Sequence, residues 1–380
     1  MKKSLVALAT LSLIGSAFAD VDVSGGVKLY GVLDQSIQNQ RLTDASSGAA
    51  TNQTGLFASA ATSRLGVKAS RDLGNGFKGV AQAEIQLDPD TATLLPNKNR
   101  TAFVGLQNES AGSIMLGSME TTAYEVFGMD VNGRVEYKPQ VWRTTASNDT
   151  QDRANNAVKY ITPEFGGFTG HLMMGFSEAP DTTSTASEFT SYGIKFHKDK
   201  LKAAFLTDKL TNTAGSYRFA GMVNAGVARD YYNANTSTAS QSKALIYAAS
   251  GNLQRDIGAI SYEFDSFTLN YIYARSYTTD TNAGSLSTNT IGIRIPFEKF
   301  TVAFSTGSGY VNSYQSANTA ATTTSTKAGS GTIADSTLGI YYNFDKSTQA
   351  YVLTSYSTST DVGYADGKNQ TIAMGVRYNF

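Results

Sequence analysis

Alternation of apolar and polar residues, read two by two, is the feature that most limits what this chain can fold into. In the final stretch, TIAMGVRYNF, one side of an extended strand carries only apolar and aromatic residues: Ile372, Met374, Val376, Tyr378 and Phe380. A terminal aromatic is an unusual group to leave in water, where chain ends normally fray. This face therefore needs a partner, which is either a second sheet or lipid.

The same alternation recurs as hairpins along most of the chain. ISYEFDSFTLNYIYA turns at Asp265 and Ser266, and IGIRIPFEKFTVAFS turns at Glu298 and Lys299. Longer segments rich in Ser, Thr, Asn and Ala separate the hairpins, at 38–58, 88–99, 177–189, 276–289, 306–334 and 358–369. Because every second connection is long, we expect the long loops at one end of a sheet and the short turns at the other.

This pattern predicts an all-β fold with sixteen strands. We expect them at 22–37, 60–72, 76–87, 100–107, 112–118, 156–162, 167–176, 190–197, 201–207, 251–264, 267–275, 290–297, 300–305, 336–344, 348–357 and 370–380. An even count with unequal connections is typical of an antiparallel transmembrane β-barrel. The region 208–250 is predicted as one extended loop. If YRFAGMVNAGVARDYY and KALIYAAS instead form a hairpin, the barrel has eighteen strands.

Two features favour lipid over a second sheet as the partner of the apolar face. Aromatic residues flank the short turns, as an interfacial girdle requires: Phe165, Phe168, Phe264, Phe267, Phe297, Phe300 and Phe344. Charged residues occupy the opposite parity at strand centres, which a dry core accepts only when they are paired. A closed barrel with a wet interior satisfies both faces and leaves no strand edge exposed. Its last strand would close against VKLYGVLD, with Tyr378 and Phe380 at the membrane boundary.

The start of the chain predicts export. Lys2 and Lys3, an apolar run from Leu5 to Ile14, and the triplet Ala17-Phe18-Ala19 follow the plan of a secretory signal peptide. We therefore expect a signal peptide at 1–19 and a single pore domain at 20–380. A transmembrane anchor is the weaker interpretation, because the run is shorter than the roughly 20 residues of a spanning helix.

Composition excludes several classes of function. The chain has 31 basic and 31 acidic side chains, so no global charge attracts nucleic acid. It has no cysteine and two histidines, which argues against thiolate or histidine metal sites and against a catalytic triad. GNGFKG matches a dinucleotide-binding fingerprint, but a period-two strand follows it instead of a helix, so it reads as a turn. We predict no enzyme activity, no metal and no cofactor.

Five stretches in order resemble the general-diffusion porins of Gram-negative outer membranes, neisserial or β-proteobacterial type. They are VKLYGVLD, SRLGVKASRDLGNGFKGVAQAE, AFVGLQNESAGSIMLGS, RANNAVKYITPEFGGF and GVRYNF. The resemblance implies a sixteen-stranded homotrimer in the outer membrane, with one pore per subunit and the third loop folded into each barrel. It implies ions and small hydrophilic solutes as cargo, and outer-membrane lipid and lipopolysaccharide as surroundings. The terminal aromatic resembles the family's assembly signal.

The connection at 119–152 is the candidate inward loop, since its apolar and aromatic residues need a place to pack. Packing over the barrel mouth is the alternative. We hypothesise an acidic loop side of the constriction, formed by Glu120, Glu125, Asp130 and Glu136. The opposing basic wall would be Lys28, Arg64, Lys68, Lys78, Arg153 and Lys159, with Arg64 and Lys68 the strongest candidates. Such a separation creates a transverse field that tunes ion preference; for each residue, a solvated wall charge is the alternative.

The chain departs from the family's arginine-rich pattern near its fifth strand, where SIMLGS carries Met115 and Ser118. Lys159 likewise stands where an arginine is common, and lysine lacks the planar fork that binds carboxylates bidentately. We therefore expect a mild ion preference of open sign. A substrate-selective channel on the same fold is the second interpretation, and an adhesive role of the long loops is a third.

Overall fold

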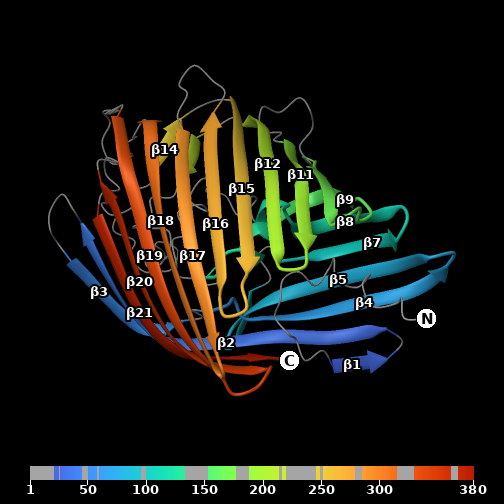
Figure 1. Ribbon diagram of the computed structural model, residues 1–380, viewed down its shortest axis with the longest axis horizontal. Coiled ribbons are helices and arrows are strands. Elements are labelled where there is room, and N and C mark those ends of the chain that lie inside the picture. The colour runs from blue at the N-terminus through green and yellow to red at the C-terminus, as the bar shows by residue number, and fades with distance from the viewer. Residues whose placement is uncertain are drawn as a thin grey trace.

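The computed structural model describes residues 21–24, 26–44, 50–57, 60–95, 100–132, 153–176, 188–213, 216–219, 245–248, 251–278, 285–314, 329–360 and 367–380. The predicted signal peptide at 1–19 and Glu136 lie outside these ranges. The strands curve around a common axis and close into a barrel (Figure 1). In the part of the chain that the structure describes, no helix is long and apolar enough to cross a membrane.

The first part of the chain supplies the strands β1 Val21–Ser24, β2 Val27–Asp44, β3 Ala50–Phe57, β4 Arg64–Gly74, β5 Phe77–Asp88, β6 Thr93–Leu95, β7 Ala102–Asn108 and β8 Gly112–Glu120. A short 3₁₀ helix, η1 (Ala123–Gly128), follows β8. The middle of the chain supplies β9 Arg153–Ile161, β10 Phe168–Gly175, β11 Glu188–Lys198, β12 Leu201–Thr213, β13 Ser216–Phe219 and β14 Leu245–Ala248. The last part supplies β15 Gly251–Glu263, β16 Thr268–Thr278, β17 Ser285–Phe297, β18 Phe300–Tyr314, β19 Gly329–Asn343, β20 Thr348–Thr360 and β21 Gly367–Asn379.

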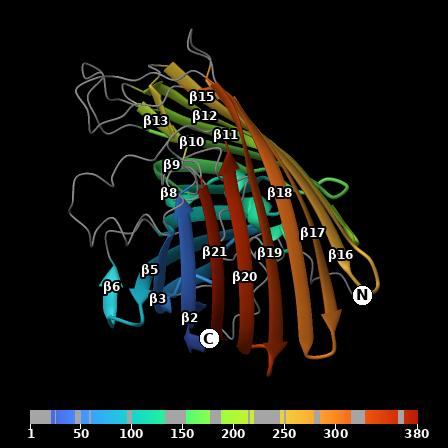
Figure 2. The same cartoon turned by 90° about the vertical axis from the view of Figure 1, so that its left-hand side faces the viewer.

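The wall has sixteen strand positions, as predicted. β3 and β4 both pair with β2, one beyond the other, and β6 and β7 share β5 in the same way. β12 pairs directly with β15. All these pairings are antiparallel, and apart from the closing pair β2–β21 the adjacent wall strands follow one another along the chain (Figure 2).

The last strand closes the barrel against the first long one. β21 pairs with β2 from Val32 opposite Asn379 to Asp44 opposite Gly367. Beyond that ladder, Phe380 and Gly31 exchange two backbone hydrogen bonds of 2.7 and 3.1 Å. Tyr378 points outward with 46% of its surface exposed. Its ring is stacked with that of Phe380, and the two ring centroids lie 6.1 Å apart. The expected closure by the terminal strand is confirmed.

The two faces of the wall differ as the alternation predicted. On β2, Leu33 and Ile37 are exposed outward, whereas Asp34, Ser36 and Gln38 are buried toward the lumen. The aromatic residues beside the short turns are also exposed: Phe165, Phe168, Phe264, Phe297, Phe300 and Phe344. An apolar outer belt ending in aromatic residues is the surface that a bilayer interface accommodates.

Short turns have the residues that their backbones need. GNGFKG forms the β4–β5 turn, where Gly74, Asn75 and Gly76 all adopt positive φ values of 86°, 52° and 77°. Glycine and asparagine tolerate this left-handed region best. The interpretation of this motif as a hairpin turn is therefore confirmed.

Several strands extend further toward the loop end than the sequence predicts. The expected loop at 38–58 contains the end of β2 and all of β3, and the expected loop at 306–334 contains the end of β18 and the start of β19. Near the loop end both faces of the wall contact polar surroundings, so Ser, Thr, Asn and Gln occupy both parities. The hydrophobic period disappears there, although the backbone ladder continues.

The region 208–250 differs from the predicted single loop. Its first residues complete β12, and β13 and β14 pair with each other as a separate two-stranded sheet. The barrel nevertheless keeps sixteen strands, because β12 and β15 occupy adjacent positions in its wall. Within the described residues, β13 and β14 therefore lie outside the wall ladder and add no strand to the barrel.

Candidate pore constriction

The connection after β8 packs its apolar side against the lumen wall. Within η1, Ala123 and Val126 are 1% exposed. With Met129 they form one buried cluster with inward residues of β12, β15 and β16: Ala204, Leu206, Ile257, Ala259, Ile272 and Ala274. These wall residues share the inward parity, so the described part of the connection lies inside the barrel. The sequence signal for this packing was the apolar content of the loop.

Polar contacts fix this segment at both ends. Before η1, the hydroxyl of Thr122 contacts that of Ser191 on β11. After η1, the backbone N–H of Val131 donates to Asn270 on β16 at 3.3 Å. Asn132 then donates to the Ser305 hydroxyl on β18 at 3.1 Å and to the Thr337 carbonyl on β19 at 3.3 Å. The segment thus follows the inner wall from β11 to β19.

Glu125 on η1 is the centre of a charged cluster with the wall. Its carboxylate contacts the ammonium groups of Lys159 on β9 and Lys195 on β11. His171 Nδ1 on β10 lies 3.6 Å from the same carboxylate. Burial alone would raise the pKa of Glu125, but the two ammonium groups hold that pKa well below its usual range. The Glu125 cluster is therefore both an ion network and an attachment of the loop.

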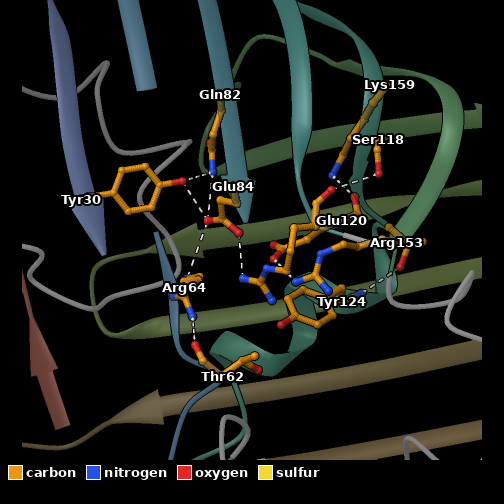
Figure 3. Close-up of polar contacts among 12 residues, drawn as sticks. Tyr30, Thr62, Arg64, Gln82, Glu84, Ser118, Glu120, Tyr124, Arg153 and Lys159 are labelled. Atoms are coloured by element: carbon orange, nitrogen blue, oxygen red, sulfur yellow. Dashed lines mark hydrogen bonds and ion pairs between the residues drawn. The ribbon is translucent and has the colours of Figure 1, made fainter. Parts of the chain in front are cut away.

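Glu120 and Arg153 form a second contact at the base of the connection (Figure 3). They pair in register on β8 and β9, and their charged groups lie 3.1 Å apart. The Arg153 guanidinium also lies over the Tyr124 ring, 5.0 Å from its centroid. A guanidinium in this position gains from the ring's negative face as well as from the carboxylate.

A third cluster belongs to the wall alone. Glu84 on β5 accepts a hydrogen bond from Tyr30 on β2 at 2.8 Å and contacts Arg100 at 2.7 Å (Figure 3). Arg64 on β4 approaches the same carboxylate at 3.7 Å, and Gln82 donates to the Tyr30 hydroxyl at 2.7 Å. The Glu84 cluster thus places two guanidinium groups around one carboxylate.

The remaining wall lysines lie nearer the turn end. Lys68 is beside the Glu84 cluster, with its ammonium group 5.2 Å from the centroid of the Tyr30 ring. Lys28 on β2 lies directly opposite Lys68 in the β2–β4 ladder. Lys78 pairs with Asp72 directly beside the β4–β5 turn, which is away from the other predicted wall residues. It is the predicted residue with the least connection to the clusters.

The arrangement differs from an acidic loop facing a basic wall across the lumen. Glu120 and Glu125 contact Arg153 and Lys159 directly, so these pairs lie on one side. Arg64 and Lys68 lie on β4, away from the wall strands that η1 contacts. The reason is that η1 docks on the same part of the wall that supplies its counter-charges. Asp130 remains with the loop tip, where it accepts the Asn132 N–H at 3.0 Å.

Four acidic, basic or histidine members of these clusters were not in the predicted set: Glu84, Arg100, Lys195 and His171. Glu84 shares the inward parity of β5 and could have been found from its position opposite the β4 residues. Lys195 and His171 join only because η1 docks beside them, which no local pattern encodes. A further basic group, Arg377 on β21, donates to Gln349 at 2.8 Å.

Comparison with known proteins assigns the chain to a family. The sequence model of a family described as Gram-negative porin matches residues 4–362. Outer membrane porin protein 32 of Delftia acidovorans is 33% identical over 201 residues, which cover 50% of this chain and 54% of that protein. The major outer membrane protein P.IB of Neisseria meningitidis serogroup B is 25% identical over 316 residues, covering 80% of this chain and 91% of that protein. The chain spans just over half the length of the first two curated relatives.

Solved structures show the same fold. An anion-selective porin from Comamonas acidovorans superposes with a TM-score of 0.67 at 18% identity, covering 93% of this chain and 99% of that one. The trimer form of OmpT from Vibrio cholerae has a TM-score of 0.59 at 14% identity, with coverage of 93% and 99%. Together with the closed sixteen-stranded wall, the family match confirms the resemblance found in the sequence. The chain belongs to the Gram-negative porin family and is a protein of the bacterial outer membrane.

Proposed function

We propose that the mature chain, residues 20–380, forms a channel for passive diffusion of ions and small hydrophilic solutes, with a mild preference for anions. The observation that carries the proposal is the contrast across a single wall strand. On β4, Arg64 and Lys68 face the lumen while Val67 between them is exposed outward. Charges inside and apolar groups outside suit a water-filled passage through lipid.

Unequal charge in the clusters supports the sign of the preference. The Glu84 cluster has two guanidinium groups for one carboxylate, and the Glu125 cluster has two ammonium groups for one carboxylate. Lys68 and Lys28 add further positive charge beside the first. Excess positive charge in a narrow passage raises the local concentration of anions. A structural relative is titled an anion-selective porin, which agrees with this sign.

We further propose a homotrimer whose subunit contacts use the outer face of β2 to β8 and β21. Exposed outward residues there are mostly aliphatic, such as Leu33, Ile37, Leu116, Ile372 and Val376. Exposed aromatic residues are concentrated instead on β10 to β19, with Phe205, Tyr271 and Phe304 among them. Aromatic belts belong at lipid interfaces, so the aliphatic sector is the better candidate for protein contact. A solved relative has a trimer form.

Reversal potentials in planar bilayers under a salt gradient test the channel and its sign. We expect the wild type to pass chloride more readily than potassium. Lys68→Ser should lower the ratio of chloride to potassium permeability about twofold, and Arg64→Ser combined with Lys68→Ser should bring it close to one. Lys78→Ser removes the same charge beside a turn and is the matched control.

Three outcomes count against the proposal. No conductance from folded wild type would remove the channel. An unchanged permeability ratio in the double variant would remove the role of these wall charges. Block by one small sugar at micromolar concentration, with no block by others, would favour the substrate-selective interpretation.

A further inference from the structure

The wall ladder is interrupted between β3 and β4, where the chain is longer than the strand beside it. β3 ends at Phe57 and β4 begins at Arg64, and the partners of these two residues on β2 are Ser36 and Val32. Six residues connect Phe57 to Arg64, whereas three residues connect their partners on β2. The excess chain must leave the ladder. Its described part is 60–63, which we call the ledge.

The ledge lies on the lumen side of the wall. Ala60 is 2% exposed and belongs to one buried cluster with inward side chains of β18 to β21: Ala303, Tyr341, Tyr351, Leu353 and Ala373. These strands lie beyond β2, across the seam where β21 closes the barrel. The ledge therefore leans inward over that seam, and η1 is not the only part of the described chain that packs on the inner wall.

Asp34 on β2 contacts both ends of the ledge. Its Oδ1 accepts hydrogen bonds from the backbone N–H of Ala60 at 3.1 Å and from the hydroxyl of Tyr351 at 2.8 Å. Its backbone N–H donates to the Ser63 hydroxyl at 2.9 Å, and this hydroxyl donates to the Asp34 carbonyl at 3.1 Å. Asp34 and Ser63 are both 0% exposed, so water does not replace these bonds when they are lost. One buried residue thus holds the ledge at its first and last positions.

Arg64 directly follows the ledge, and its guanidinium folds back onto it. The guanidinium donates to the Thr62 carbonyl at 3.1 Å, and its Nε lies 3.7 Å from the Glu84 carboxylate (Figure 3). The backbone of the ledge is fixed beside it, because the Ser63 carbonyl accepts the N–H of Leu87 on β5 at 3.0 Å. A long side chain keeps one direction only where its neighbours hold it there. The position of the ledge therefore determines where the Arg64 guanidinium points.

We infer that Asp34 is a positioning residue for ion selectivity: it holds the ledge, and the ledge directs the Arg64 guanidinium toward the path of the ions. The inference rests on the proposed anion preference and identifies a residue that sets it from a buried position. A carboxylate that acted only through its charge would repel anions, so its removal would raise the ratio of chloride to potassium permeability. A carboxylate that acts by holding the ledge has the opposite effect, because its removal releases Arg64 and lowers this ratio.

A matched pair of variants separates the two roles, because both variants remove the same charge. Asp34→Asn keeps an acceptor oxygen for Ala60 and Tyr351, whereas Asp34→Ala does not. In reversal-potential measurements on the folded full-length protein in planar bilayers, we expect Asp34→Asn to have a permeability ratio at or above that of the wild type. Asp34→Ala should have about half the ratio of Asp34→Asn. Amide hydrogen exchange in the ledge should be faster in Asp34→Ala and unchanged in Asp34→Asn.

A double-mutant cycle tests whether the effect passes through Arg64. In the Arg64→Ser background, Asp34→Ala and Asp34→Asn should have equal permeability ratios, because the side chain that the ledge directs is absent. Equal ratios of the two variants with Arg64 present would overturn the inference. A difference that persists in the Arg64→Ser background would overturn it as well.

Ser63→Ala provides a second test that changes no charge, and it decides the matter if Asp34→Ala does not form the barrel. We expect its permeability ratio to fall by less than twofold, and the fall to disappear in the Arg64→Ser background. Ser276→Ala is the matched control, since it removes another fully buried hydroxyl, on β16 away from the ledge. A ratio in Ser63→Ala equal to that of Ser276→Ala would overturn the inference.

Failure of the proposed function has a different signature. A wild type without anion preference, in which Arg64→Ser leaves the permeability ratio unchanged, would overturn the proposed sign and the selective role of Asp34 together. A normal response to Arg64→Ser, with no difference within the Asp34 pair, would overturn the role of Asp34 and leave the proposed channel intact.

Discussion

The Glu84 cluster and the Glu125 cluster surround one carboxylate with two cations each, yet they come from different parts of the chain. Glu84, Arg64 and Tyr30 all lie on adjacent wall strands that the barrel ladder already fixes. Glu125 lies on η1, and its partners Lys159 and Lys195 lie on the wall. The same electrostatics therefore have two consequences: in the wall they set the lumen charge, and at the loop they also determine where η1 lies.

Glu125→Gln should show the difference between the two clusters most strongly. It removes the anion that both Lys159 and Lys195 contact, and leaves the buried Lys159 ammonium and the partly buried Lys195 ammonium without this counter-charge. Loss of one member of a buried ion network costs about 3 kcal/mol or more, and here the loss falls on loop docking. We expect frequent current fluctuations and subconductance states in single-channel recordings, with an increased preference for anions.

The barrel itself provides the control for this variant. Thermal loss of the β-sheet signal in circular dichroism should shift little, because the wall ladder does not include η1. Quiet single-channel currents in Glu125→Gln would contradict the assigned attachment. In that event, the packing of Val126 and Met129 would be sufficient to hold the segment.

Glu84→Gln removes the corresponding carboxylate of the wall cluster and should leave the loop in place. Tyr30, Arg64 and Arg100 keep their positions on the wall, so we expect quiet currents and no subconductance states. The permeability ratio of chloride to potassium should rise about twofold, because one lumen carboxylate is neutralised beside two guanidinium groups. Fluctuating currents in this variant equal to those of Glu125→Gln would show that the two clusters do not differ as argued.

The wall cluster was the more predictable of the two. Parity placed Arg64 and Lys68 in the lumen from sequence alone, and the same rule applies to Glu84 on the partner strand of the hairpin. The turn chemistry of Gly74 and Asn75 fixed which residues of β4 and β5 face each other. Where one face is apolar, register follows from the sequence, and neighbours in the wall can be derived.

The loop cluster could not be derived in the same way. The apolar residues of η1 indicated that it needs a packing surface, but several inward faces of the wall offer one. Lys195 and His171 contact Glu125 only because η1 docks beside them, where Val126 packs in one cluster with Ala204 and Leu206. The loop ends of the strands were missed for a related reason, since Ser305 to Tyr314 carries polar residues on both parities and lacks a hydrophobic period.

Asn132→Ala should loosen the far end of the loop segment with a smaller effect. The variant loses the hydrogen bonds to Ser305 and to the Thr337 carbonyl, worth about 1–2 kcal/mol together. We expect faster amide hydrogen exchange at 129–132 and a modest increase in current noise, with the permeability ratio unchanged. Asn132→Asp is the matched variant, because it keeps the acceptor and loses the donors. Exchange as slow as in the wild type for both variants would assign the position of the tip to η1 packing alone.

Acid titration should give the smallest effect, because it changes only the charge of the Glu125 carboxylate. The pKa of Glu125 in the folded protein lies well below its ordinary value of 4.5 because Lys159 and Lys195 oppose the effect of burial. A lowered pKa stabilises docking at every pH above that ordinary value, and this stabilisation is lost as the pH falls through the lowered pKa. Current fluctuations like those of Glu125→Gln should therefore be absent at pH 5 and appear only well below pH 4.5. His171 also faces this carboxylate, and His171→Gln measured over the same range separates the protonation of His171 from that of Glu125. Fluctuations that already begin above pH 4.5 in the wild type and are absent from His171→Gln would assign the acid response to His171.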